Sequence, residues 1–515
     1  MDSFIKSVMS KQREVVFFSS TAIALYGYDQ GMMSLINTNY DYLDRMGLAG
    51  DSPMVGVIVS VYYLGCAVGA VVASWYADWK GRKLSIFACL LTASLGNLFM
   101  FIAGIDNTRG ARTLMLVGRV VMGLGVGGID SVVPVYSSEL SADEARGKAL
   151  AQEFQMNIFG LLMAFLINLG VTIALGKENQ WAWRIPIIIM QVYPLIMFSV
   201  AQRLPETPRW FISHGRKKDA HAALLEMLGG EEPAKAKLEE LVDAHDEESS
   251  QSIGYKDMLL PNGSQFHPTV VTIMGQVNQA LTGYGAVSVY GPQIFELLGF
   301  GVRLSEYLTL GNYISYFFMM TFAWLLIDKV GRRPLMIWGA FGIAICFALL
   351  TAFGGLAMNA DRLGIVRLGV AVPGIVTLFV ATATFGIGWL AEPWLIPTEI
   401  YPSSARAQGA AVSVIIWGLA NFAVTLLTPI GFNNLKYLLF LVFAVTNSFA
   451  AWWTWAYSPE SGGRSFEENQ DFFKHAESEK TWMVRKIQGG AYKRMPDQGK
   501  QGDESGEREP LLSSS

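Results

Sequence analysis

The stretch that decides the fold is LVGRVVMGLGVGGIDSVVPVYSSELSADEARG, residues 116–147. Arg119 stands near the start of its apolar run, where a charged side chain at membrane depth is costly. Asp130 follows eleven residues later, about three helical turns, so the two charges share one helix face. An arginine in this position requires a partner of opposite charge, and Asp29 lies in the first apolar segment, within GYDQG. The sequence predicts that Asp29 and Arg119 form a pair inside the membrane.

The same stretch carries a family resemblance. Its elements are, in order, Gly118-Arg119, a series of spaced glycines, Pro134, Tyr136, Glu139 and, after a gap of six residues, Arg146-Gly147. They resemble the fourth helix of sugar porters, a branch of the major facilitator superfamily. The resemblance implies an all-helical membrane transporter with twelve transmembrane helices, and not an enzyme. Without it, the glycines and the arginine are also consistent with a tightly packed helix that holds one structural arginine.

The composition indicates a membrane protein. The 515 residues are 52% hydrophobic and 16% charged, which is too apolar for a soluble chain of this size. The three cysteines lie in apolar segments and predict no disulfide framework. The five histidines show no metal-ligand spacing, so we expect neither a metal nor a cofactor. We expect a monomer in the lipid bilayer that binds a small-molecule substrate and no nucleic acid.

Twelve segments are apolar and long enough to span a bilayer, which requires about 20 residues. Six precede a polar central segment: 14–36, 54–77, 84–104, 113–136, 148–175 and 184–203. Six follow it: 268–298, 304–327, 334–355, 369–396, 405–428 and 435–457. We therefore divide the chain into a six-helix half (1–204), a cytoplasmic loop with amphipathic helices (205–266), a second six-helix half (267–457) and a partly disordered cytoplasmic tail (458–515).

Basic residues in short loops predict the orientation. They cluster between the second and third segments (Lys80, Arg82, Lys83) and between the eighth and ninth (Lys329, Arg332, Arg333), on the side of both termini. That side should be cytoplasmic. The plasma membrane is the default location. The tail, however, places Glu507 four residues before Leu511-Leu512, which resembles an acidic dileucine sorting signal for endosomes or the vacuole. Two leucines adjacent by chance are the alternative.

The two halves repeat one charge pattern at the predicted cytoplasmic side. ADWKGRK (77–83) matches IDKVGRR (327–333), and SSELSADEAR (137–146) matches PTEIYPSSAR (397–406). Duplicated halves around a central site are typical of major-facilitator transporters. We expect a gate whose charges bridge the halves when the inner side is closed; alternatively, these charges only set the topology. The gate residues are Asp78, Arg82, Glu139, Arg146, Glu206 and Arg209, with counterparts Asp328, Arg332, Glu399, Arg406 and Glu460.

The resemblance also indicates where a substrate would bind. Gln279 stands at the first of two adjacent glutamines that the family carries in its seventh helix, but Ala280 and Gly285 replace the second glutamine and an asparagine. The expected substrate residues are Gln279, Tyr290, Trp389, Trp394, Trp417, Asn421, Gln155 and Asp130. Helix packing for the tryptophans and an interhelical hydrogen bond for Gln279 are the alternatives. The lost amides and the added acids (Asp130, Glu153, Glu392) predict a substrate other than glucose.

The Asp29–Arg119 pair resembles the proton-coupling pair of sugar–proton symporters. An adjacent arginine stabilises a carboxylate, and separating the two in a low-dielectric site favours proton binding. The sequence therefore predicts a proton-coupled secondary active transporter of a sugar or related polyhydroxylated molecule, working by alternating access. A proton-independent facilitator, an exporter of a secondary metabolite and a nutrient sensor are the alternatives.

Overall fold

The computed structural model describes residues 2–49, 52–105, 110–140, 146–250, 253–364, 366–464 and 466–487. All regular elements among these residues are helices, as the sequence predicts. The tail beyond residue 487, which includes the predicted dileucine signal, lies outside the described residues.

The N-terminal helices form one bundle. They are α1 (Asp2–Ile36), the short α2 (Tyr40–Met46), α3 (Pro53–Lys80), α4 (Arg82–Ile102), α5 (Ala111–Leu140), α6 (Arg146–Leu175), α7 (Gln180–Ile189) and α8 (Val192–Ala201). Helix α5 carries Arg119 and packs against α3 and α4. A Cβ atom at Gly127 of α5 would lie 2.2 Å from the carbonyl oxygen of Cys66 on α3, so only glycine allows this approach. The predicted close helix packing is therefore present.

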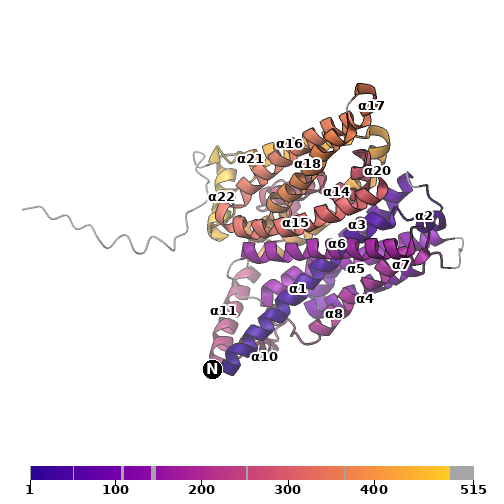
Figure 1. Ribbon diagram of the computed structural model, residues 1–515. Helices are drawn as coiled ribbons and strands as arrows, with labels where there is room; N and C mark the ends of the chain where they lie inside the picture. Colours follow the sequence, from indigo (N-terminus) through magenta and orange to yellow (C-terminus); the bar gives the residue numbers. More distant parts are fainter. Residues whose placement is uncertain are drawn as a thin grey trace, which may run out of the picture.

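The C-terminal helices form a second bundle beside the first (Figure 1). They are α13 (Phe266–Leu281), α14 (Tyr284–Leu297), α15 (Val302–Val330), α16 (Arg332–Met358), the short α17 (Ala360–Leu363), α18 (Arg367–Gly388), α19 (Glu392–Ile400), α20 (Ser403–Leu435) and α21 (Leu438–Tyr457). The bundles meet mainly along two helix pairs, α6 with α15 and α3 with α20, and α1 also contacts α14.

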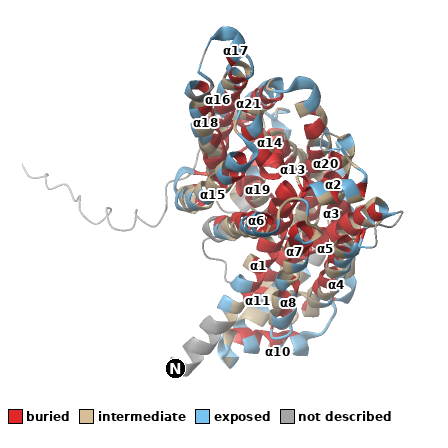
Figure 2. Ribbon diagram, turned by 45° about the vertical axis from the view of Figure 1, so that its right-hand side comes forward, coloured by how far each residue is buried: buried red, intermediate tan, exposed pale blue. Residues whose placement is uncertain are grey.

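The polar segment between the bundles is also helical. It folds into α9 (Pro208–Ser213), α10 (Lys217–Leu228), α11 (Glu231–Ser250) and α12 (Tyr255–Leu259), and α22 (Phe466–Ser478) follows the second bundle. Helix α11 contacts both α10 and α20, so it connects this segment to the second bundle. Figure 2 shows buried residues along the helices of both bundles and mainly exposed ones on α17.

Ten helical stretches among the described residues are long and apolar enough to cross a membrane. The other two predicted spans lie in α1 and in the α13–α14 pair. Three predicted spans are not continuous helices, because the chain breaks between α7 and α8, α13 and α14, and α18 and α19. Gly283, at the second break, has φ +83°, a left-handed conformation that favours glycine. Hydropathy identified the spans correctly but not these interruptions.

Candidate functional site

The predicted ion pair is present at the centre of the first bundle. Arg119 of α5 donates Nη1–H to Oδ1 of Asp29 on α1 in a short contact, and both side chains are at most 2% exposed. Arg119 also donates to the carbonyl oxygens of Ile58 (3.3 Å) and Val59 (3.1 Å) on α3. Its guanidinium lies 4.6 Å from the ring centroid of Tyr62. These contacts hold one arginine between three helices, with Asp29 as its counter-charge.

Asp130 does not compete for Arg119. Eleven helical residues separate their backbones by about 16 Å along the axis, beyond what the two side chains can bridge. Asp130 has no hydrogen-bond or ion-pair partner among the described residues. It is partly exposed although it lies in the middle of a helix. Its carboxyl group is therefore left without a partner in the middle of α5.

Two of the predicted substrate tryptophans come together where the bundles meet. Trp394 of α19 and Trp417 of α20 have ring centroids 5.7 Å apart, and Trp417 also contacts Tyr26 of α1 (5.1 Å) and Tyr63 of α3 (5.4 Å). We call Tyr26, Tyr63, Trp394 and Trp417 the aromatic cluster. It draws side chains from both bundles, so a ligand bound against it would contact both.

Trp389 does not join the aromatic cluster. Its indole N–H donates to the carbonyl oxygen of Met336 on α16 at 2.8 Å, and the side chain is fully buried in the second bundle. Trp389 is the residue that follows α18, and Trp394 lies in α19, so the helix break separates the two tryptophans. This hydrogen bond is consistent with helix packing, the alternative interpretation, and a substrate contact of Trp389 stays a prediction.

The predicted amide ligands make mainly structural contacts in this structure. Gln279 donates Nε2–H to the carbonyl oxygens of Trp389 (2.7 Å) and Leu390 (3.0 Å), and its own Oε1 is buried without a partner. Asn421 donates to the carbonyl oxygen of Trp417 within α20, at 2.9 Å. The hydroxyl of Tyr290 lies 3.5 Å from the carbonyl oxygen of Thr425. Gln279 thus stabilises the helix break and leaves one acceptor free.

Gln155 lies at the contact between the bundles and not at the centre. Its Nε2 donates to the carbonyl oxygen of Phe317 on α15 at 3.1 Å, and its Oε1 accepts from the indole of Trp324 at 3.0 Å. It therefore ties α6 to α15. The neighbouring Phe154 is the residue that contacts Trp394, with ring centroids 5.8 Å apart.

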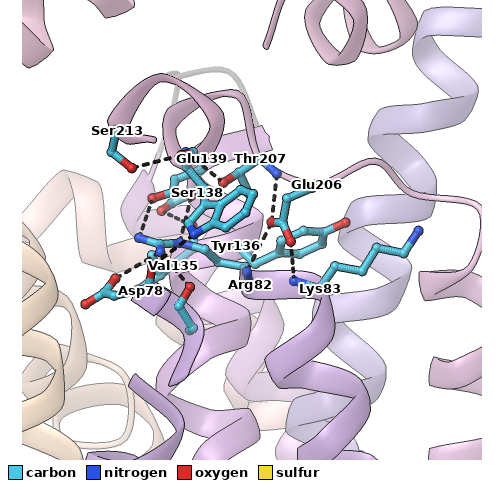
Figure 3. A network of polar contacts seen from close by, with 12 residues as sticks. Asp78, Arg82, Lys83, Val135, Tyr136, Ser138, Glu139, Glu206, Thr207 and Ser213 are labelled. Carbon is cyan, nitrogen blue, oxygen red and sulfur yellow. Dashed lines mark hydrogen bonds and ion pairs between the residues drawn. The ribbon is translucent and has the colours of Figure 1, made fainter. Parts of the chain in front are cut away.

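The charges at the end of the first bundle form one network (Figure 3). Arg82 contacts Asp78 at 2.9 Å and Glu139 at 3.4 Å. The carboxylate of Glu206 accepts from the backbone N–H groups of Arg82 (3.1 Å) and Lys83 (2.9 Å). Burial raises the pKa of Glu206, while these N–H groups and the charge of Arg82 oppose that rise.

The second bundle repeats this network. Arg332 contacts Asp328 at 3.0 Å and Glu399 at 2.7 Å. Glu460 accepts from the backbone N–H groups of Arg332 (3.0 Å) and Arg333 (3.1 Å). Glu399 additionally accepts from the hydroxyl of Ser461 at 2.5 Å.

These contacts show how the charges predicted to form the gate lie in this structure, and a gate that bridges the halves when the inner side is closed stays a prediction. The ion pairs of Arg82 and of Arg332 each stay within one bundle instead of bridging the two, because each arginine has acids of its own bundle within reach. Arg209 lies on α9 and Arg406 on α20, and both make polar contacts. Arg146 is the first residue of α6, and its side chain lies outside the described set.

Comparison with known proteins identifies the chain. Residues 15–473 match the family model described as "Sugar (and other) transporter". The chain belongs to the sugar transporter family. It is therefore a multi-pass membrane transporter of the major facilitator superfamily, and not an enzyme.

Curated relatives cover most of the chain. It is 30% identical to the MFS-type transporter oryC of Aspergillus oryzae, over 88% of this chain and 84% of that protein. It is 28% identical to the major myo-inositol transporter IolT of Bacillus subtilis, over 90% and 95% respectively. Among solved structures, the proton:xylose symporter XylE matches with a TM-score of 0.75 over 90% of this chain and 99% of that chain, at 22% identity. The XylE match shows that the folds agree.

Sequence reasoning missed several polar residues of the transporter. Gln30 of α1 donates to the hydroxyls of Tyr26 (2.5 Å) and Tyr63 (3.4 Å), and so connects two rings of the aromatic cluster. Lys177, after α6, contacts the buried Glu306 of α15 at 2.6 Å and joins the two bundles. The four-residue spacing of Tyr26 and Gln30 on one helix face was the available signal for the first contact. Nothing in the sequence pairs Lys177 with Glu306.

Proposed function

We propose that this protein is a proton-coupled secondary transporter of a sugar or related polyhydroxylated molecule. The observation that supports this most directly is the buried contact between Asp29 and Arg119, an ionisable pair on two helices of one bundle. Ionisable residues inside a membrane are expensive and usually functional. A relative named as a myo-inositol transporter and a structural neighbour titled a proton:xylose symporter support the substrate class and the coupling.

The pair suggests a simple coupling step. While Arg119 contacts Asp29, its positive charge stabilises the ionised form of the carboxyl group. A movement that separates them leaves an uncompensated carboxylate in a low-dielectric site, which favours proton uptake. Substrate bound against the aromatic cluster contacts helices of both bundles, including α1, which carries Asp29. Substrate binding would thus shift α1 and change the protonation of Asp29.

We further propose that residues 1–204 and 267–457 move as two units around the centre, with both termini cytoplasmic and the plasma membrane as the location. Loop lysines and arginines near Arg82 and Arg332 support this orientation. An exporter or a proton-independent facilitator is the second candidate, because Ala280 and Gly285 replace two amides that the resemblance leads us to expect.

Uptake into liposomes containing the purified protein tests the proposal, with labelled myo-inositol, xylose and glucose as substrates. A pH gradient of one unit is worth about 1.4 kcal/mol per proton, so a one-proton symporter accumulates substrate about tenfold. We expect this accumulation in the wild type and in the surface control Asp44→Asn. Asp29→Asn should only equilibrate substrate, because asparagine keeps a hydrogen bond to Arg119 but cannot titrate. Equilibration without accumulation by the wild type would indicate a facilitator.

A further inference from the structure

An ion pair joins the two bundles at the end far from the arginine networks. Lys177 follows α6, and its Nζ lies 2.6 Å from Oε1 of Glu306, in the second turn of α15. Their side chains are 11% and 1% exposed. Asp328, an acid of the Arg332 network, lies 22 residues further along the same helix, or about 33 Å along its axis. The ion pair therefore lies at the opposite end of α15 from that network.

Lys177 is held in place by its own bundle. Helix α6 ends at Leu175, and the next residue, Gly176, has φ +85°, a left-handed conformation that ends the helix and favours glycine. The carbonyl oxygen of Lys177 accepts from the backbone N–H groups of Tyr40 (2.9 Å) and Asp41 (3.3 Å) at the start of α2. The turn after α6 is thus fixed to α2, and the lysine side chain reaches across to α15.

Glu306 has a second cation on its own helix. Arg303 donates Nη1–H to the other carboxylate oxygen, Oε2, at 2.7 Å. Because Arg303 and Glu306 belong to one helix, they stay together if the bundles separate. Lys177 would leave, because it belongs to the first bundle. The carboxylate thus keeps one counter-charge in either arrangement, which makes this pair less costly to separate than an isolated buried pair.

Below the ion pair, buried side chains of the two bundles pack against each other. Phe165 and Leu169 of α6 and Tyr313 of α15 belong to one cluster, and each is at most 2% exposed. The rings of Phe165 and Tyr313 have centroids 5.2 Å apart. Tyr313 lies seven residues after Glu306, so this contact is about 10 Å further along α15 than the ion pair. Both contacts must separate if the bundles part at this end.

We infer that Lys177 and Glu306 form a gate at this end of the transporter: the pair holds the bundles together while the end is closed and separates when it opens. The inference rests on the proposed function only for the movement of the two bundles. Lys177 meets Glu306 only in the closed arrangement, so removing that contact shifts the equilibrium toward the open one. Arg303 meets Glu306 in both arrangements, and its removal has no such effect.

The labelling rate of a cysteine placed in the apolar contact tests this inference. Leu169→Cys is introduced into the full-length protein, which is purified in detergent and treated with a water-soluble maleimide. The protein without this substitution gives the background from its three buried cysteines. We expect Lys177→Gln and Glu306→Gln each to speed labelling at position 169 about tenfold, which corresponds to about 1.4 kcal/mol in the opening equilibrium. Arg303→Gln is the matched control and should leave the rate unchanged, because its contact lies within one bundle.

Two results would overturn the inference. Unchanged labelling in Lys177→Gln or in Glu306→Gln would show that the pair does not hold this end closed. Equal acceleration by Arg303→Gln would show that Glu306 requires both cations for stability and not for a gate. Glu306→Gln leaves no buried acid without a counter-charge, so it decides the question even if Lys177→Gln fails to fold. Labelling requires neither substrate nor a proton gradient, so a failure of the proposed coupling or substrate appears in the uptake assays and leaves this result unaffected.

Discussion

The two bundles agree closely at one end and differ at their centres. At the shared end, Glu206 and Glu460 each accept from two consecutive backbone N–H groups, at distances of 2.9 to 3.1 Å. The glycines that precede these groups, Gly81 and Gly331, have φ of +107° and +99°. A Cβ atom there would lie 2.4 Å from Glu206 or 2.5 Å from Glu460. The same glycine and acid are therefore required twice.

The centres are not repeated. The first bundle contains the buried pair Asp29 and Arg119. In the second, Gln279 donates to the carbonyl oxygens of Trp389 and Leu390 at the break between α18 and α19. We infer that the repeated ends have the same function in both bundles, whereas the two centres have different functions. The first bundle would handle the proton and the second would position the substrate.

The largest effect is expected from substitutions in the Asp29–Arg119 pair at the centre of the first bundle. Removing one partner of a buried ion pair costs about 3–5 kcal/mol, unless the remaining carboxylate binds a proton. Arg119→Leu should therefore abolish accumulation in liposomes while the protein still folds, because Asp29 can become neutral. Adding Asp29→Asn to Arg119→Leu should not restore accumulation. Recovery in the double variant would mean that the pair is only structural.

The next effect concerns a difference between the repeated ends. The contact of Arg332 with Glu399 is 2.7 Å, and the corresponding contact of Arg82 with Glu139 is 3.4 Å. A charge-assisted hydrogen bond contributes about 1.5–3 kcal/mol, and the contact at 3.4 Å is too long for a strong one, so it should contribute less. Arg332→Gln should lower the thermal unfolding midpoint in detergent more than Arg82→Gln does. Equal decreases of the unfolding midpoint, or a larger decrease for Arg82→Gln, would show that the shorter contact of Arg332 does not stabilise the protein more.

Substitutions of Gly81 and Gly331 test whether the repeated ends of the two bundles contribute equally to stability. A β-carbon in the left-handed region, close to a carboxylate, costs about 1–3 kcal/mol. Gly81→Ala and Gly331→Ala should therefore each lower the unfolding midpoint, by amounts equal within error. Gly299→Ala, which also has positive φ (+97°) but nothing within 4 Å of its added Cβ, separates backbone strain from the clash. Unequal decreases of the unfolding midpoint for Gly81→Ala and Gly331→Ala would mean that the two ends share a geometry but differ in their contribution to stability.

The smallest effect is expected in the second centre. Gly285 lies close to Asn421, whose Oδ1 would be 3.3 Å from a Cβ added at that position. Ala280→Gln with Gly285→Asn should strengthen competition by glucose, since each amide that meets a hydroxyl contributes about 0.5–1.5 kcal/mol. Competition should be measured against the same labelled substrate in both proteins. An unchanged glucose inhibition constant would place the substrate away from these positions.

The sequence predicted the spans from apolar length, and it predicted the long-range ion pair because a charge inside a span requires a partner of opposite charge. Apolar length identifies a span, and Arg119 in such a segment requires a buried acid such as Asp29. The helix breaks were missed because hydropathy sums side chains and carries no information on φ and ψ. The break between α18 and α19 separates Trp389 from Trp394, and the indole of Trp389 donates to the carbonyl oxygen of Met336 on α16. Its role at the substrate stays a prediction.

Long-range polar contacts were the least predictable part of the candidate site. Gln155 was expected at the substrate, but its amide reaches α15 instead. The contact of Lys177 with Glu306 joins residues more than a hundred positions apart. Such pairs depend on how the two bundles lie against each other, which no local pattern specifies.

The central claim is that Asp29 carries the coupled proton, and substrate-driven proton movement tests it most directly. Proteoliposomes are suspended in weak buffer with no initial pH gradient, myo-inositol or another transported substrate is added, and a pH electrode follows the outside. The account predicts external alkalinisation by the wild type, because protons enter with substrate. It predicts no pH change for Asp29→Asn while labelled substrate still equilibrates. Alkalinisation of equal size in Asp29→Asn would contradict it.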